Sequence, residues 1–125
     1  MSGSMDLDVR TRRLPGDVAV VELAGEMDMY TTPKAREAVD ALLEGKTYRL
    51  AIDLSRTVYL DSTALGMLKG TFDRCRTRGG GLRLVNPTVR IRRVLEITGL
   101  LTVFPVDESV EQAVATLTET AEATP

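Results

Sequence analysis

Apolar and polar side chains alternate near the beginning of the chain, in a pattern typical of β-strands. Residues 7–12 alternate in this way, and residues 18–23 (VAVVEL) form a second run rich in β-branched side chains. Between them, Pro15 fixes one backbone dihedral angle and Gly16 permits a positive φ, so this pair of residues favours a tight turn. The pattern therefore predicts that the chain opens with a β-hairpin.

Later in the chain, apolar residues recur at intervals of three and four, which is typical of helices with one buried face. The first such stretch has Thr32 as a suitable N-cap and Pro33 at the first helical position. The last has Ser109 at capping-box spacing, although Asp107 is an alternative cap. In chain order, four helices are expected after Thr32, Asp61, Thr88 and Ser109, and they are expected to end at Gly45, Gly79, Gly99 and near Thr118.

Three further strands are expected between these helices, at residues 49–54, 82–85 and 103–106. Pro105 argues that the last strand lies at a sheet edge, because proline has no amide hydrogen to donate. Since a helix crosses over between successive strands, their pairing should be largely parallel after the hairpin. We therefore predict an α/β fold with a mixed sheet of about five strands and about four helices.

At 125 residues, the chain is the size of one domain with a modest core. We assign residues 6–118 to this domain. Residues 1–5 are expected to be a cloning remnant followed by a start at Met5, and residues 119–125 a frayed polar tail. No apolar run approaches the length of a membrane span, so we expect neither a signal peptide nor a membrane partner.

The composition argues against several classes of function. The net charge is only −2 and no long basic run is present, so we do not expect nucleic-acid binding. The chain has no histidine, which removes the Ser-His-Asp and Cys-His catalytic sets. With Cys75 as its only cysteine, we expect no metal site and no cofactor. The lone thiol excludes an intramolecular disulfide and fits a reducing cytoplasm.

The stretch from Leu50 to Gly70 carries the most informative chemistry. It begins as an apolar strand and then opens a helix at Asp61, Ser62 and Thr63. The free amides of a first helical turn and the helix dipole favour a negative group. One interpretation is that Ser62 or Asp61 simply caps the helix, and the residues alone favour it. The other is that Ser62 accepts a phosphoryl group, which adds a charge of about −1.5 to −2 at pH 7.

The segment from Asp28 to Thr32 is a second candidate site. It follows a strand and should emerge at the same sheet edge as the Asp61 loop, where loops commonly form a joint binding surface. The alternative, a solvated turn with a helix cap, is favoured by composition.

A glycine run and two basic clusters carry less information. The run at 79–81 lacks the Lys-Ser/Thr ending of a phosphate-binding loop and precedes a strand, so we expect it to end a helix. The basic clusters are expected to be solvated helix faces, with engagement of an acidic partner as the alternative. They consist of Arg74, Arg76 and Arg78 and of Arg90, Arg92 and Arg93.

Four short motifs follow the order that they have in the STAS domain of bacterial anti-sigma factor antagonists. Residues 59–66 (YLDSTALG) resemble the Asp-Ser-Ser/Thr-Gly-Leu-Gly signature that opens a helix in this family. Residues 23–28 (LAGEMD) resemble its turn after the second strand. Residues 83–86 (RLVN) and 97–100 (ITGL) resemble a later strand and helix end. The resemblance extends from about residue 6 to residue 117 and implies a single STAS-like domain.

This resemblance implies a switch rather than a catalyst. Family members bind a cognate anti-sigma factor, often a serine kinase with a histidine-kinase-like ATPase fold, and free a sigma factor while unphosphorylated. The kinase phosphorylates the serine after the motif Asp, here Ser62, and a metal-dependent serine phosphatase reverses the reaction. The partner-binding residues implied by the resemblance are Asp28, Tyr30, Thr31, Asp61, Ser62, Thr63, Ala64, Leu65 and Gly66.

One position departs from the family motif, since Ala64 stands where the signature has glycine. If that glycine allows close approach by the kinase backbone, phosphorylation of Ser62 would be slowed or prevented. If the position only requires a small residue in the first helical turn, alanine would favour the helix. The sequence leaves both alternatives open.

Two other functions also stay open on the sequence. The first is a STAS scaffold or regulatory subunit of another signalling or transport complex. The second is a small enzyme or nucleotide-binding domain that uses Asp28, Asp53 and Asp61. The second has less support, because no metal or phosphate motif accompanies those carboxylates.

Overall fold

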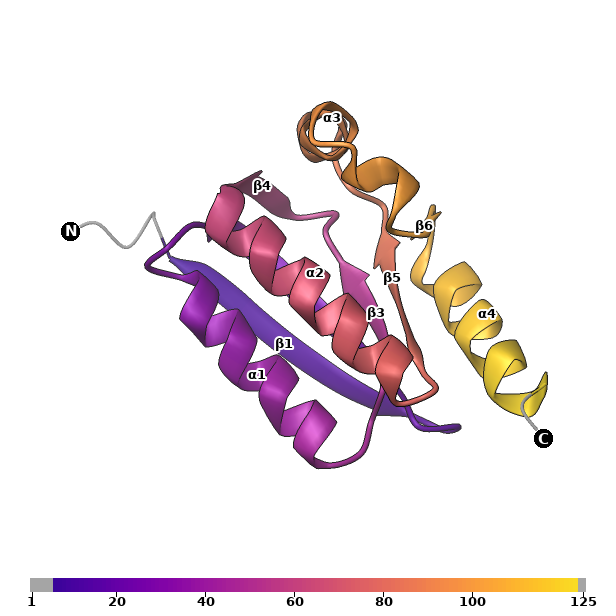
Figure 1. Ribbon diagram of the computed structural model, residues 1–125. Coiled ribbons are helices and arrows are strands. Elements are labelled where there is room, and N and C mark those ends of the chain that lie inside the picture. The colour runs from indigo at the N-terminus through magenta and orange to yellow at the C-terminus, as the bar shows by residue number, and fades with distance from the viewer. Residues whose placement is uncertain (1–5, 124–125) are drawn as a thin grey trace.

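The computed structural model describes residues 6–123 as one sheet with helices on both faces (Figure 1). The segment at 1–5, where the sequence predicts a cloning remnant and a start, lies outside the described residues. The elements are β1 (Leu7–Leu14), β2 (Val18–Met27), α1 (Thr32–Glu44), β3 (Arg49–Asp53), β4 (Thr57–Leu60), α2 (Ser62–Thr77), β5 (Gly81–Val85), α3 (Val89–Ile97), the 3-10 helix η2 (Leu100–Thr102), β6 (Val106–Asp107) and α4 (Val110–Ala123).

The strands pair as the sequence predicts. β1 and β2 form an antiparallel hairpin in which Leu14 lies opposite Val18. The strand order is β1-β2-β3-β5-β6, and every pair after the hairpin is parallel, with helices crossing between (Figure 1). The mixed α/β sheet and its largely parallel pairing are therefore confirmed. β6, which begins directly after Pro105, is one of the edge strands, as expected for a strand next to this proline.

β4 is a strand where the sequence predicts a loop. It pairs with the last residues of β2, which extends beyond its predicted end at Leu23 as far as Met27. The buried Thr57 hydroxyl donates a hydrogen bond to the Leu23 carbonyl, and a shift in register follows Gly25. A strand of four residues with both ends buried and its middle exposed has no clear alternation, so local pattern does not reveal it.

The structure identifies the N-caps of α1 and α4. The first differs from the predicted cap, and the second is one of two predicted alternatives. Thr32 is predicted as the N-cap of α1, but Thr31 holds that position and Thr32 is the first helical residue, with its side chain fully buried. At the start of α4, the Ser109 hydroxyl accepts a hydrogen bond from the first turn at 3.1 Å. Asp107 instead binds Arg83 at 2.6 Å, so Ser109 is the cap.

The last strand is shorter than the predicted 103–106 and begins at Val106. The Leu100 carbonyl accepts hydrogen bonds from the amides of Val103 and Phe104, both at 3.0 Å, and these bonds hold the preceding segment in a tight turn. After this strand, α4 continues to Ala123, past its predicted end near Thr118. The end of the predicted tail, residues 124–125, lies outside the described residues.

Alternation along β2 divides its side chains between two cores. Ala19, Val21 and Leu23 belong to the main core, together with residues of α1, α2 and α3. Val18 and Val20 belong to a smaller core on the other face, closed by α4. Because both faces of this strand are covered, its sequence is an almost continuous apolar run.

Cys75 lies in the main core with no exposed surface, and burial raises the pKa of its thiol to about 11, with the charge of Arg74 lowering it in part. Each unit of pKa lowers the thiolate fraction about tenfold. We therefore expect Cys75 in the folded protein to react with Ellman's reagent at pH 8 at least about 100-fold more slowly than in 6 M guanidinium. Equal labelling rates in the two conditions would contradict this burial.

Candidate functional site

The polar groups at the start of α2 have separate tasks. Asp61 is the N-cap, because its Oδ1 accepts a hydrogen bond from the Ala64 amide at 3.0 Å and its backbone is extended. Of the two caps that the sequence allows, the structure selects Asp61. Its own amide donates to the Met27 carbonyl at 3.1 Å, which ties the start of the helix to the end of β2.

Ser62 is the first residue of α2, and its side chain is exposed. Within residues 6–123, the Ser62 hydroxyl has no hydrogen-bond partner, since Asp61 already serves as the cap. The first amides of a helix have no intrahelical acceptor, and the helix dipole is positive there, so the position favours a negative group. The Ser62 hydroxyl can therefore be modified without breaking a side-chain contact of the fold.

The loop between β2 and α1 is held by its own polar groups. Asp28 Oδ1 accepts hydrogen bonds from the amides of Tyr30 and Thr31 at 2.8 and 2.9 Å. The Thr31 hydroxyl donates to the Glu26 carbonyl at 2.7 Å. The Thr31 amide is the largest influence on the pKa of Asp28, which is lowered although desolvation opposes the change. Asp28 thus fixes the shape of the loop.

This loop presents apolar side chains to solvent. Met29 is 59% exposed and Tyr30 is 82% exposed, and β4 adds the exposed Val58 and Tyr59. Tyr30 is among the residues that the family resemblance implies as partner contacts, whereas Met29 and Val58 are not predicted from the sequence. A single apolar residue in a loop, or in a strand that is not recognised, gives no periodic signal.

The pairing of β2 with β4 brings the two candidate segments together. Met27 lies opposite Leu60 in this parallel pair, so the Asp28 loop and the Asp61 junction leave the same edge of the sheet side by side. The expectation that both segments emerge at one edge is confirmed. The starts of α1 and α2 thus lie at the same end of the molecule (Figure 1).

Two of the nine residues implied as partner contacts face inward. Ala64 has no exposed surface and Leu65 is 8% exposed, and both belong to the main core. Their side chains are therefore not available to a partner. The position of Ala64 also bears on its difference from the family glycine, because its methyl group points into this chain and not toward the surface.

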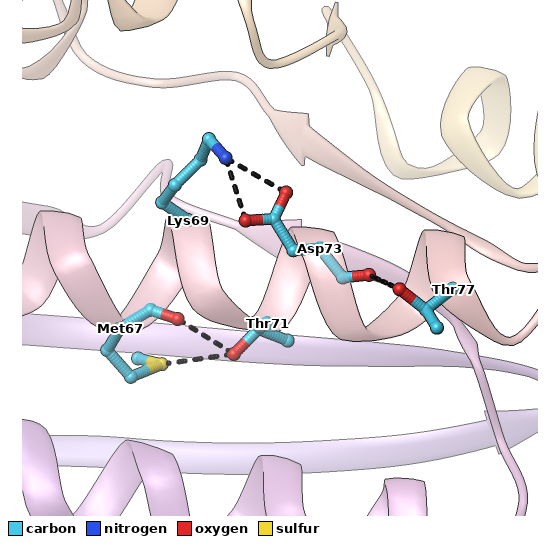
Figure 2. A network of polar contacts seen from close by, with 5 residues as sticks. All are labelled: Met67, Lys69, Thr71, Asp73 and Thr77. Atoms are coloured by element: carbon cyan, nitrogen blue, oxygen red, sulfur yellow. Dashed lines mark hydrogen bonds and ion pairs between the residues drawn. The ribbon is translucent and has the colours of Figure 1, made fainter.

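α2 also exposes two glycines, Gly66 and Gly70. Apart from the backbone of the same helical turn, a Cβ added to either would meet no atom of the described residues within 4 Å. Figure 2 shows the polar contacts farther along the helix, where Lys69 binds both carboxylate oxygens of Asp73 and the Thr77 hydroxyl donates to the Asp73 carbonyl. No contact among the described residues therefore requires glycine at position 66 or 70.

Replacing Gly66 or Gly70 with alanine is expected to raise the free energy of unfolding by about 0.5–1 kcal/mol each, because glycine loses more backbone entropy in a helix. Urea denaturation followed by circular dichroism measures this change. Ala64→Gly, in the same helix, is the matched reverse substitution and is expected to lower stability. A loss of stability in Gly66→Ala would show that the fold itself needs this glycine.

The three carboxylates considered for an enzyme are each engaged by nearby backbone amides. Asp53 Oδ1 accepts a hydrogen bond from the Ser55 amide at 2.9 Å, as Asp28 and Asp61 accept from their own loops.

Among residues 6–123, no three acidic or cysteine side chains gather in a way that could hold a metal ion. In the same range, no helix has the length and apolar character needed to cross a membrane.

Comparisons with known proteins give a consistent assignment. Residues 9–113 match the STAS domain family. The chain is 36% identical over 110 residues to the anti-sigma-B factor antagonist of Bacillus subtilis, a match that covers 88% of this chain and 99% of that protein.

Solved structures share the fold. An anti-sigma factor antagonist from Mycobacterium paratuberculosis has a TM-score of 0.82 and 28% identity, covering 94% of this chain and 98% of that one. The Bacillus cell fate determinant SpoIIAA in its phosphorylated form has a TM-score of 0.71 and 21% identity, covering 87% of this chain and 98% of that one. At that identity, the second likeness is one of fold alone.

Proposed function

This chain belongs to the STAS domain family of anti-sigma factor antagonists, and on that premise we propose how it acts. In its unphosphorylated form, it binds a cognate anti-sigma factor and thereby releases a sigma factor. The anti-sigma factor is a serine kinase with a histidine-kinase-like ATPase fold, and it ends the interaction by phosphorylating Ser62. A metal-dependent serine phosphatase restores the binding form. The exchange takes place in the cytoplasm, where transcription occurs.

The observation that carries this proposal is that Asp61, and not Ser62, caps α2. Asp61 caps α2, so the exposed Ser62 hydroxyl has no hydrogen bond to lose among the described residues. If Ser62 were the cap, phosphorylation would remove the helix's own N-terminal contact. The fold therefore tolerates both states of the serine, as a reversible switch requires. SpoIIAA, solved in a phosphorylated form, supports the compatibility of the fold with phosphate.

The surroundings of Ser62 suit a protein partner. The exposed side chains of Met29 and Tyr30 stand on a loop whose backbone Asp28 holds by hydrogen bonds, so the backbone that carries them is ordered before binding. Exposed aromatic side chains on rigid supports are typical of the residues that contribute most to binding energy. In this proposal, Tyr30, Thr31, Thr63 and Gly66 contact the partner, whereas Asp28 and Asp61 position the surface.

Phosphorylation changes the surface more than the fold. A phosphate on Ser62 adds about −1.5 to −2 charges at pH 7, and the N-terminal dipole of α2 offsets part of this charge. The neighbouring Asp61 carboxylate repels it. When a partner covers the site, the phosphate must also lose water beside apolar side chains such as Met29, which is costly. Binding is therefore weakened while α2 stays folded.

The test is titration calorimetry with the purified anti-sigma factor of the source organism. Wild type and Ser62→Ala are expected to bind with similar affinity. Ser62→Asp and the phosphorylated protein are expected to bind about 30-fold more weakly or worse, equivalent to about 2 kcal/mol. Equal affinities for wild type and Ser62→Asp would argue against the charge switch.

Mass spectrometry after incubation with the kinase and ATP locates the phosphate. Thr63→Ala is the matched control, because Thr63 is exposed beside Ser62. We expect Thr63→Ala to be phosphorylated normally and Ser62→Ala to remain unmodified. Phosphate on Thr63 in the wild-type protein would refute the assignment of Ser62.

A further inference from the structure

The outer face of α3 exposes apolar side chains that this chain does not bury. Val89 is 85% exposed and Ile97 is 77% exposed. Residues at i, i+4 and i+8 lie along one helix face, so Val89, Arg93 and Ile97 form a continuous stripe. The inward face is formed by Ile91 and Leu95, which have no exposed surface. α3 thus has an apolar inner face that packs in the core and a second, mixed face with no partner among the described residues.

The same face is basic. Arg90, Arg92 and Arg93 are all exposed, and Glu96 is the one acidic residue of α3. Within residues 6–123, none of these three guanidinium groups has an ion-pair or hydrogen-bond partner. Four arginines elsewhere have acidic partners, in the pairs Arg10–Asp8, Arg12–Glu22, Arg74–Asp40 and Arg83–Asp107. Other arginines, such as Arg36 and Arg56, also have no ion-pair partner among the described residues, so what distinguishes α3 is three unpaired arginines on one short helix beside exposed apolar side chains.

α3 lies next to the strand that leads to Ser62. α3 packs against β4, and β4 is hydrogen-bonded to the end of β2 and leads directly into Asp61. Among the described residues, the exposed large apolar side chains all belong to the β2–α1 loop, β4 or α3; they are Met29, Tyr30, Val58, Tyr59, Val89 and Ile97. The unburied apolar surface of the described chain is therefore concentrated in these three connected segments.

We propose that the outer face of α3, formed by Val89, Arg90, Arg93 and Ile97, is a second docking patch for the anti-sigma factor that binds at Ser62. The inference rests on the proposed function. Its occupant is a segment of that protein with acidic side chains around an apolar centre, because unpaired guanidinium groups require carboxylates and the two exposed aliphatic side chains require apolar contact. The patch adds affinity at a distance from the phosphorylated residue.

The test compares paired substitutions by titration calorimetry with the purified anti-sigma factor. The charge pair Arg90→Glu/Arg93→Glu is expected to weaken binding about 10–100-fold, with a loss that shrinks as salt rises. The apolar pair Val89→Ser/Ile97→Ser is expected to weaken it about tenfold or more, with no salt dependence. All four side chains are exposed, so thermal unfolding should change little and confirm that each variant is folded.

A control pair separates local contact from net charge. Lys46→Glu/Arg76→Glu makes the same change in charge at exposed positions outside the three segments and is expected to change affinity less than twofold. Equal losses in the control and the α3 charge pair would overturn the patch. Wild-type affinity in both the charge pair and the apolar pair of α3 would also overturn the patch. A further outcome is that the α3 variants keep full affinity for the anti-sigma factor but change their self-association in sedimentation or lose binding to anionic phosphatidylserine vesicles. Either result would assign the face to another occupant and overturn the proposal.

The same titrations distinguish the two proposals. Binding that responds to Ser62→Asp but not to the α3 pairs would leave the proposed function standing and remove the second patch. If the wild-type protein does not bind the anti-sigma factor at all, both proposals fail together.

Discussion

Gly80→Ala is expected to lower the free energy of unfolding by about 3 kcal/mol or more, the largest loss among the single substitutions considered for this fold. A Cβ added to Gly80 would lie 2.6 Å from the carbonyl carbon of Tyr48 and 2.8 Å from its Cβ. This part of Tyr48 cannot move away easily, because its carbonyl accepts the hydrogen bond from the Gly81 amide at 2.9 Å. The backbones after α2 and before β3 thus approach as closely as only glycine allows.

The neighbouring glycines serve as matched controls in the same urea denaturation series. A Cβ on Gly81 would lie 3.6 Å from a methyl group of Leu117, an ordinary contact, so Gly81→Ala should stay within about 0.5 kcal/mol of wild type. Gly79 has open space but a φ of +79°, so alanine there should cost about 1 kcal/mol. If Gly80→Ala has the same free energy of unfolding as Gly79→Ala or a higher one, the close approach of Gly80 to Tyr48 is refuted.

Tyr30→Ala is expected to lower affinity for the anti-sigma factor about 30-fold, equivalent to about 2 kcal/mol, while the free energy of unfolding changes by less than about 0.5 kcal/mol. The reason is that Tyr30 is 82% exposed and its ring supports no core contact, so the fold loses little with it. Its backbone amide, which binds Asp28, is retained by alanine. This prediction depends on the proposed function, and calorimetry and urea denaturation measure its two parts.

Tyr30→Phe is the control for the kind of contact. If the ring is buried by the partner, phenylalanine should keep most of the affinity, because it retains the apolar surface. If the phenol hydroxyl makes the main contact, both variants should lose affinity alike. Unchanged affinity in Tyr30→Ala would remove the β2–α1 loop from the binding surface.

Helices and parallel strands were predictable because they bury one stripe or one run of side chains. In α2, for example, apolar residues recur at intervals of three and four, and all of them lie in the core; they are Leu65, Leu68, Phe72 and Cys75. β4 was not predictable in this way. Its four residues pair only because β2 runs past the end of β3, and its buried Thr57 is polar yet satisfied by the Leu23 carbonyl.

The candidate site was predictable in its residues but not in its roles. Ser62 and the Asp28 loop were identified from motifs and strand order, and the structure brings them to one end of the sheet. The sequence cannot choose between two adjacent capping residues, because Asp and Ser have similar preference for that position. It also cannot tell on which side of the helix start the methyl group of Ala64 lies.

By itself, then, the sequence determines the α/β order, the hairpin, the helix faces and the exposed serine at a helix start, since each depends on neighbours within a few turns of chain. The tertiary structure decides that Asp61 is the cap, that Ala64 and Leu65 face the core, and that the loop of Met29 and Tyr30 adjoins Ser62. These features depend on the pairing of β2 with β4 and on α2 packing against the sheet. Both join residues far apart in the chain, and no local pattern encodes such contacts.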